Sequence, residues 1–470
     1  MVLRVAVVGG GIAGVTAALE LRERVPDAEV LLLEAAPRLG GKLGLREVAG
    51  VQVDTGAESM LARRPEGTDL ARRVGLGDDV VHPRKVGASI WTRGALRPMP
   101  PTVMGVPADR AALAASGILS TSGLWRTRAD VPRGLPERDV SVGDYVASRL
   151  GREVVDRLVE PLLGGVYAGH ASRLSLLSAA PQVAALVDGR TRLVAAAAGS
   201  LARTRATADG AATPVFAGVR GGIGRLPEAV AAASGAEVVT GATVRELRRT
   251  PHGWRLVHGP TTHPVAVDVD AVVLAVPGAP AARLVGEIAP VAARALREVE
   301  YASMAIVTLA VAPGSVDPGL GSGFLVPPVD GRSIKAATFS SRKWGWLDAG
   351  ADGPFVLRTS VGRAGEEELL QRDDAELVDL AMADLADAAG LRGPLLDAHV
   401  QRWGGALPQY DVGHAERIAT VEDAVERVPG LELCGAAYRG VGIPAVVAGA
   451  RAAAGRVVDR WAATTSRAPQ

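Results

Sequence analysis

Cysteine and histidine, the residues of disulfides and of many metal sites, are scarce in this sequence. Its one cysteine, Cys434, excludes a disulfide within the chain, and its seven histidines are scattered rather than clustered. No apolar run reaches the roughly 18 residues of a transmembrane helix, and the first residues lack the regions of a signal peptide. We therefore expect a cytoplasmic protein without a metal site, and we leave peripheral membrane contact open.

Neither sign of charge is in excess. The 52 Lys and Arg residues balance 51 Asp and Glu residues, which leaves a formal net charge of +1. No overall field then attracts nucleic acid, and affinity for anions depends on where individual arginines lie. Aromatic residues make up only 3% of the chain, so alanine, valine and leucine fill most of the interior. The 470 residues suggest two or three domains.

The beginning of the chain carries a dinucleotide-binding pattern. Residues 3–8 form an apolar run of strand length, a glycine-rich turn follows, and apolar residues then recur at helical spacing to about residue 25. The glycines permit a tight turn, a close approach to a pyrophosphate and close helix packing, and the helix start offers free N–H groups. The residues expected at the diphosphate are Gly9, Gly11, Ile12, Ala13 and Gly14.

An acidic residue ends the second predicted strand, residues 30–34. Glu34 lies 20 residues after Gly14, where a carboxylate can accept hydrogen bonds from ribose hydroxyls. The same carboxylate would repel a 2′-phosphate. The pattern therefore favours FAD or NAD over NADP.

Two segments that follow decide for FAD by resemblance. Residues 34–42 resemble the second flavin motif of the amine-oxidase-like flavoproteins, and residues 54–59 resemble the stretch that those enzymes place beside the flavin ring. An arginine supplies charge and a fork of donors for a diphosphate. Lys42 stands where that family usually has arginine, so it keeps the charge without the fork. The cofactor residues that this resemblance implies are Ala35, Arg38, Gly40, Gly41, Lys42, Gly56, Ala57, Glu58 and Ser59.

The end of the chain repeats the arrangement of strand, glycine turn and helix over residues 431–458. It resembles the C-terminal flavin motif of the same superfamily, which implies contacts from Gly435, Val441, Gly442 and Ile443. The glycines of 221–227, a helix and a strand at 236–239 predict a third contribution to the cofactor site, and the same family resemblance places Val244 near the adenine. Residues 270–276 predict a further buried strand of the same sheet.

These segments predict an α/β fold with a discontinuous Rossmann-like FAD-binding domain, an inserted α+β substrate domain and a helical subdomain. The FAD-binding domain is expected at 1–85, 218–290 and 400–465. The substrate domain is expected at 86–95, 181–217 and 291–399, and the helical subdomain at 96–180.

Three further stretches narrow the family. Residues 160–170, 96–107 and 402–414 resemble the protoporphyrinogen and coproporphyrinogen oxidases, and the second stretch resembles their Gram-positive branch. The resemblance runs from residue 3 to about 458 and places Trp403 near the flavin. It implies an FAD-dependent and oxygen-dependent six-electron oxidation of coproporphyrinogen III to coproporphyrin III in haem biosynthesis, with release of hydrogen peroxide. Protoporphyrinogen IX is the alternative substrate.

A porphyrinogen is a large apolar macrocycle edged with carboxylates, so its site should be an apolar slot with basic residues at the rim. The candidates are Arg63, Arg64, Arg93 and Arg97. The family resemblance adds Gly169, whose carbonyl could accept from pyrrole N–H groups. No catalytic side chain is assigned, because the flavin N5 carries the chemistry.

Other functions remain open from the sequence. A flavin amine oxidase usually frames the flavin with aromatic residues, whereas residues 440–444 contain none. A carotenoid-type desaturase and a non-catalytic flavoprotein that binds porphyrin are the remaining alternatives. A homodimer and a transient contact with a ferrochelatase also remain open.

Overall fold

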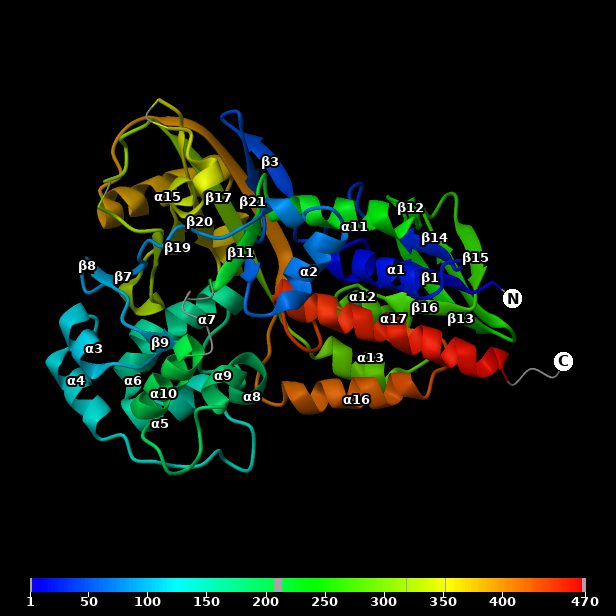
Figure 1. Ribbon diagram of the computed structural model, residues 1–470, viewed down its shortest axis with the longest axis horizontal. Coiled ribbons are helices and arrows are strands. Elements are labelled where there is room, and N and C mark those ends of the chain that lie inside the picture. Colours follow the sequence, from blue (N-terminus) through cyan, green and yellow to red (C-terminus); the bar gives the residue numbers. More distant parts are fainter. Residues whose placement is uncertain (1, 207–213, 318, 351, 467–470) are drawn as a thin grey trace.

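The computed structural model describes residues 2–206, 214–317, 319–350 and 352–466. A parallel sheet with its covering helices occupies one end of the molecule in Figure 1, and a mixed sheet and a group of short helices occupy the other end. Among the described helices, none is long and apolar enough to cross a membrane.

The first sheet has five strands, and every neighbouring pair runs parallel. Its strands, in spatial order, are β12 (Glu237–Val239), β2 (Glu29–Leu33), β1 (Arg4–Val8), β16 (Ala271–Leu274) and β22 (Leu431–Leu433). The side chains of β1 and β16 are almost all apolar and buried, which is typical of strands covered on both faces. Segments from the beginning, middle and end of the chain therefore meet in one sheet, as the sequence predicted.

Both faces of this sheet are covered. Val5 and Val7 of β1 face one layer of helices, which are α1 (Ile12–Arg24), α2 (Pro65–Arg73), α11 (Leu226–Ser234) and α17 (Ile443–Thr465). Ala6 and Val8 face the other layer. That layer contains β13 (Val244–Thr250), β14 (Gly253–His258), β15 (Val265–Val269), α12 (Gly278–Leu284), α13 (Pro290–Arg297) and α16 (His414–Glu426). The alternation along β1 thus supplies two hydrophobic cores.

The second sheet has seven strands and is mixed. Its strands, in spatial order, are β21 (Leu395–Pro408), β17 (Tyr301–Val311), β20 (Phe355–Val361), β19 (Ile334–Thr338), β18 (Gly323–Leu325), β7 (Ser89–Thr92) and β8 (Ala95–Pro98). One face packs against α15 (Asp374–Ala389), a helix that begins with a reciprocal capping box between Asp373 and Glu376. The other face turns toward the segments expected at the flavin.

The helical part has a core of its own, built around residues such as Leu113, Tyr145, Leu163 and Leu193. Its helices are α3 (Arg110–Ser116), α4 (Thr121–Arg128), α5 (Val142–Leu150), α6 (Arg152–Val154), α7 (Glu160–Tyr167), α8 (Leu176–Ala179), α9 (Pro181–Ala184) and α10 (Leu193–Ala206). The short strands β9 (Thr102–Val103) and β10 (Val106–Pro107) precede them. Short elements lie between the parallel-sheet part, the mixed-sheet part and the helical part. They are β3 (Leu45–Val48), β4 (Val51–Asp54), β5 (Met60–Leu61), β6 (Val80–Val81), β11 (Phe216–Val219) and α14 (Ser340–Lys343).

Three segments belong to a different part of the fold from the one that the expected domain boundaries gave them. β8 belongs to the mixed sheet, although the helical region was expected from residue 96. α9 and α10 pack in the helical core, although 181–217 was expected in the substrate domain; residues 207–213 of that range lie outside the described residues. β21 pairs with β17 up to Pro408, although the flavin domain was expected from residue 400. Hydrogen bonding and packing between distant strands set these boundaries, and local composition does not reveal them.

Candidate functional site

The turn between β1 and α1 leaves no room for side chains at two of its glycines. Gly9 has a φ of +107°, and a Cβ there would lie 2.6 Å from the carbonyl oxygen of Ala275. A Cβ on Gly14 would lie 1.7 Å from the carbonyl oxygen of Gly9. Around Gly11, which precedes α1, the space is open apart from Gly41. Ile12 and Ala13 open α1, whose first turn has neither an acidic residue nor a side-chain cap. The turn therefore fits a diphosphate at a free helix start.

Glu34 lies beside this turn, where the sequence spacing predicted an acid. Its Oε2 accepts a hydrogen bond from the N–H of Gly10 at 2.6 Å, and its Oε1 accepts from the N–H of Ala36 at 2.7 Å. The backbone of Glu34 also pairs with Val239 and Ala242, just before Val244 opens β13. The expected ribose and adenine residues are thus neighbours.

The loop after β2 returns to the glycine turn. The N–H of Gly40 donates to the carbonyl of Gly10 at 2.9 Å, and Gly40 and Gly41 both have positive φ. Arg38, which follows the exposed Ala35, donates to the carbonyls of Leu39, Gly41 and Leu43 at 3.0 to 3.1 Å. Arg38 therefore shapes the loop that was expected to contact the diphosphate.

Lys42 lies at the inner end of this loop. Its Nζ is 5.7 Å from the centre of the Tyr301 ring, which is the distance of a cation–π contact. Burial lowers the pKa of Lys42 to about 8. A Cβ on Gly56 would lie 1.9 Å from the carbonyl oxygen of Lys42, so the two expected flavin segments touch where only glycine fits.

Two carboxyl groups anchor residues 54–59, and their pKa values move in opposite directions. Burial raises the pKa of Asp54 to about 7, although its carboxylate accepts hydrogen bonds from the N–H groups of Ile223 (3.1 Å) and Gly224 (2.9 Å). Burial would also raise the pKa of Glu58, but Lys343 and Arg358 outweigh it and lower that pKa to about 2. Asp54 thus joins residues 54–59 to the glycine-rich segment at 221–227, which was expected to make the third contribution to the cofactor site.

Glu58 joins the loop to the mixed sheet. Its carboxylate pairs with Lys343 at 2.5 Å and with Arg358 at 3.0 Å. Arg358 of β20 also donates to the carbonyl of Gly56. Trp403 of β21 donates from Nε1 to the carbonyl of Thr55 at 2.9 Å. Ala57 and Ser59 lie on the same loop, and the side chain of Ala57 is exposed. Lys343 and Arg358 are the residues that sequence reasoning missed, because neither belongs to a local motif.

The C-terminal motif closes the same region from the other side. Gly435 and Gly440 have positive φ, and the N–H of Gly440 donates to the Tyr410 hydroxyl at 2.7 Å. Gly442 precedes α17, whose first residue, Ile443, packs in the core beside α1 and α2. Val441 instead packs against the helical core. The motif therefore stands where the parallel-sheet part and the helical part meet, a position that the sequence did not predict.

The five expected substrate residues lie in three places. Arg63 and Arg64 are exposed just before α2, and Arg64 pairs with Glu66 at 2.5 Å. Arg97 donates to the carbonyls of Thr92 and Arg93 on the β7–β8 hairpin. This hairpin is at the opposite edge of the mixed sheet from β21, which carries Trp403.

Two of these five residues have close neighbours within the protein. Arg93 has a φ of +54° and lies 3.6 Å from Glu153. Gly169 is buried, and a Cβ there would lie 2.0 Å from Oε1 of Gln409. Arg63 and Arg64 follow the expected flavin loop closely in the sequence. Substrate contact by any of the five stays a prediction.

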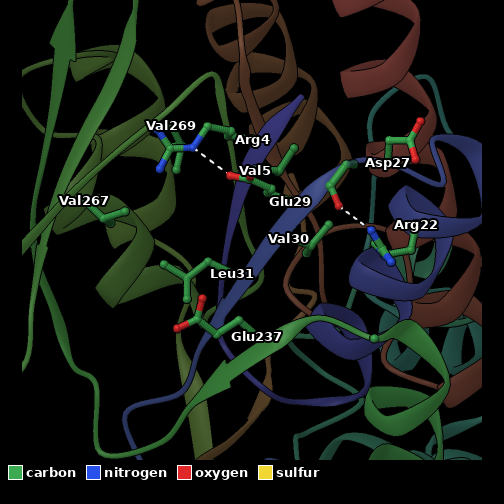
Figure 2. A pocket seen from close by; sticks show the side chains of 12 residues that line it. Arg4, Val5, Arg22, Asp27, Glu29, Val30, Leu31, Glu237, Val267 and Val269 are labelled. Atoms are coloured by element: carbon green, nitrogen blue, oxygen red, sulfur yellow. Dashed lines mark hydrogen bonds and ion pairs between the residues drawn. The ribbon is translucent and has the colours of Figure 1, made fainter. Parts of the chain in front are cut away.

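A separate hollow of about 330 Å³ lies at the other end of the parallel sheet, as Figure 2 shows. Arg4 and Glu29, which line it, begin β1 and β2 and pair with each other at 3.1 Å. Ligands of open α/β sheets bind outside the carboxyl ends of the strands, where the glycine turn lies. This hollow is therefore unrelated to the expected cofactor site. Among the described residues, no group of three or more His, Cys, Asp or Glu side chains could hold a metal ion.

Known proteins resemble this chain over nearly its whole length. Residues 12–458 match the family described as flavin containing amine oxidoreductase. Coproporphyrinogen III oxidase of Mycobacterium tuberculosis (strain H37Rv) is 38% identical over 467 residues, which are 98% of each chain. Coproporphyrinogen III oxidase of Bacillus subtilis (strain 168) is 30% identical over 94% of each chain. A crystal structure of a candidate protoporphyrinogen oxidase from Exiguobacterium sp. 255-15 superposes with a TM-score of 0.85 at 30% identity, and covers 97% of this chain and 98% of the other.

Proposed function

The chain belongs to the family of flavin containing amine oxidoreductases, and on this premise we propose that it oxidises coproporphyrinogen III to coproporphyrin III in haem biosynthesis. The cofactor is FAD, as the family implies. The observation that carries the proposal is the meeting of four distant segments, residues 9–14, 34–42, 54–59 and 435–443, around the carboxyl edge of the parallel sheet. The full-length likeness to coproporphyrinogen III oxidases supports the substrate.

The residues present fit FAD. Gly9, Gly11 and Gly14, with the free start of α1, would hold the diphosphate, and Glu34 would accept from the ribose. Arg38 and Lys42 would add positive charge on the same side. When bound, FAD would supply the redox chemistry: it would take two electrons, as a hydride, in each of three oxidations, and oxygen would then take up these electrons to give hydrogen peroxide.

The protein then has to hold and shield the reacting partners. Glu58, held ionised between Lys343 and Arg358, fastens the loop of residues 54–59 to the mixed sheet. Trp403 holds the same loop through the carbonyl of Thr55. These contacts fix the angle between the flavin segments and the face of the sheet that would receive the macrocycle, so they position the two reactants.

Aerobic turnover of the purified flavoprotein tests the proposal. Porphyrin fluorescence and hydrogen peroxide are followed with coproporphyrinogen III and, separately, with protoporphyrinogen IX. We expect faster oxidation of coproporphyrinogen III, with three peroxide molecules per porphyrin. Faster oxidation of protoporphyrinogen IX would instead indicate that this alternative is the substrate of the enzyme. Tight porphyrin binding without peroxide would indicate a carrier, and inactivity on both substrates would contradict the proposal.

A further inference from the structure

A buried lysine on the mixed sheet has no role in the site described so far. Lys335 of β19 is only 4% exposed. Its Nζ donates to the carbonyl of Gly362 at 2.6 Å and lies 3.9 Å from Sδ of Met304. Among the described residues, no carboxylate lies within ion-pair distance of it, whereas Lys343 has Glu58. Buried charges are ordinarily paired because their desolvation is costly, so a lysine left without a counter-ion needs an explanation.

A β-bulge aims this side chain. β19 pairs with β20 through Ile334 opposite Val361 and Ala336 opposite Ser360, which leaves Lys335 as the extra residue. Ile334 and Ala337 both face the core under α15. Counted back from Ala337, strict alternation would put Lys335 on that face too, so the extra residue of the bulge turns Lys335 to the opposite face. Bulges are common next to active sites for this reason.

Lys335 lies on the face of the mixed sheet that is turned toward the flavin loop, residues 54–59. Met304, its neighbour, stands opposite Trp403 in the pairing of β17 with β21, so the two side chains point to the same side of the sheet. Trp403 reaches the carbonyl of Thr55 from that side. Met304 is only partly buried, and a flexible thioether can move aside for a ligand. The side chain of Met304 therefore separates the Lys335 ammonium from the sheet face that carries Trp403, and this side chain can move.

The helical part bounds the same region. α7 packs against β18 and β19, and its residue Val166 is 41% exposed although it is apolar. The loop after β20 contacts the end of α7, because the N–H of Ala364 donates to the carbonyl of Ala168. Lys335 thus lies at the junction of the mixed sheet with the α7 segment whose sequence resembles the porphyrinogen oxidases.

The local electrostatics favour an incoming anion. Arg363, also buried, pairs with the half-exposed Glu366 at 3.3 Å and donates to the carbonyl of Val326. Burial, with a smaller effect of Arg363, lowers the pKa of Lys335 to about 7. A carboxylate beside the ammonium would reverse this cost, because the desolvated pair gains a charge-assisted hydrogen bond.

We propose that Lys335 binds a propionate of the macrocycle and is a specificity-determining residue for coproporphyrinogen over protoporphyrinogen. The inference rests on the proposed function. Coproporphyrinogen carries a propionate on each of its four pyrroles, whereas protoporphyrinogen has vinyl groups on two of them. A vinyl group at Lys335 leaves the buried ammonium without a counter-ion, and a site built for a polar group discriminates strongly against a ligand that lacks it.

The test compares Lys335→Met with wild type and with Lys85→Met, which removes an exposed lysine and serves as the matched control. The ratio of kcat/KM for coproporphyrinogen III to that for protoporphyrinogen IX should fall about 10- to 100-fold in Lys335→Met, mainly through KM. Lys335→Gln, which can still donate to Gly362 but carries no charge, should show the same fall. The flavin absorbance should be unchanged in all three variants.

A binding measurement separates this inference from the proposed function. Coproporphyrin III and its tetramethyl ester are titrated into each flavoprotein, and Lys335→Met should weaken binding of the tetra-acid without affecting the neutral ester. An equal loss on both porphyrinogens, wild-type selectivity in Lys335→Gln, or equal weakening of acid and ester would each overturn the role of Lys335. Failure of wild type to oxidise coproporphyrinogen III would instead contradict the proposed function, while the titration would still decide whether Lys335 binds a carboxylate.

Discussion

Under the proposed function, the two sheets of this protein would bind their ligands in different ways. At the carboxyl edge of the parallel sheet the contacts would come from the backbone, because Gly9 and Gly14 leave no room for side chains and the first turn of α1 has no side-chain cap. On the mixed sheet the proposed contacts would depend on buried charged side chains, above all Arg358 and Lys335. The first site needs a local backbone shape, and the second needs charges that distant segments bring together.

The difference determines how each site responds to substitution. A glycine turn has no flexible part that can absorb an added atom, so a single methyl group can destroy it. A charged cluster fails in another way, because removal of one partner leaves the others buried without compensation. Substitutions in the two regions should therefore differ in size and in the property that they change.

The largest effect is expected at the glycine turn. Gly14→Val would place its Cβ 1.7 Å from the carbonyl oxygen of Gly9, and backbone cannot give way there. We expect purification without FAD and a loss of at least about 3 kcal/mol in the free energy of unfolding. Flavin absorbance and thermal unfolding measure both. Gly449→Ala, where nothing lies within 4 Å, is the control and should retain FAD; a yellow Gly14→Val protein would refute the backbone account.

The ionic contact between the two regions should give the next largest effect. Glu58→Ala leaves Lys343 and Arg358 without a carboxylate, which should cost about 3–5 kcal/mol in the free energy of unfolding. Chemical denaturation measures this value. Glu422→Ala, which removes an exposed partner of Arg439, should cost less than about 1 kcal/mol. Similar losses in both variants would show that the ion pairs of Glu58 stabilise the fold no more than an exposed ion pair does.

Asp54 and Glu58 should respond to pH with opposite signs. The raised pKa of Asp54, about 7, means that the folded state binds its proton more tightly, so stability falls as pH rises from about 4 to about 7. The lowered pKa of Glu58 gives stability that is present above about 4.5 and lost as pH falls toward 2. Melting temperatures of Asp54→Asn between pH 4 and 8 should lack the fall that we expect for wild type. Parallel curves for the two proteins would exclude titration of Asp54 in this range.

The smallest effect is expected at the exposed rim. Arg64 is 46% exposed and already paired with Glu66, so Arg64→Ala should raise the KM for coproporphyrinogen III only about three- to tenfold and leave the flavin spectrum unchanged. The difference should shrink at high salt because exposed charges are screened. Arg72→Ala, an exposed arginine on α2, is the control. An unchanged KM would remove Arg64 from the substrate site.

Much of the fold could be predicted because its signals are local. The strands β1, β2 and β16 and the helices α1 and α17 follow from apolar runs, glycine turns and helical spacing, and their residues lie close to the predicted ranges. The segment of residues 402–414, which carries Trp403 near its start, illustrates the limit. Its motif predicted a place near the flavin, but its strand is the edge of the mixed sheet and continues to Pro408, since pairing with β17 extends that far.

The sequence by itself determined the parallel sheet, its glycine turn and the family, because a backbone that must approach a diphosphate requires glycine at set positions. Only the tertiary structure decided which charges meet on the substrate side. Arg358 lies 300 residues from Glu58, and no local spacing links them. The orientation of Lys335 likewise depends on a bulge against β20, since the register of a strand is set by its partner and not by its own residues.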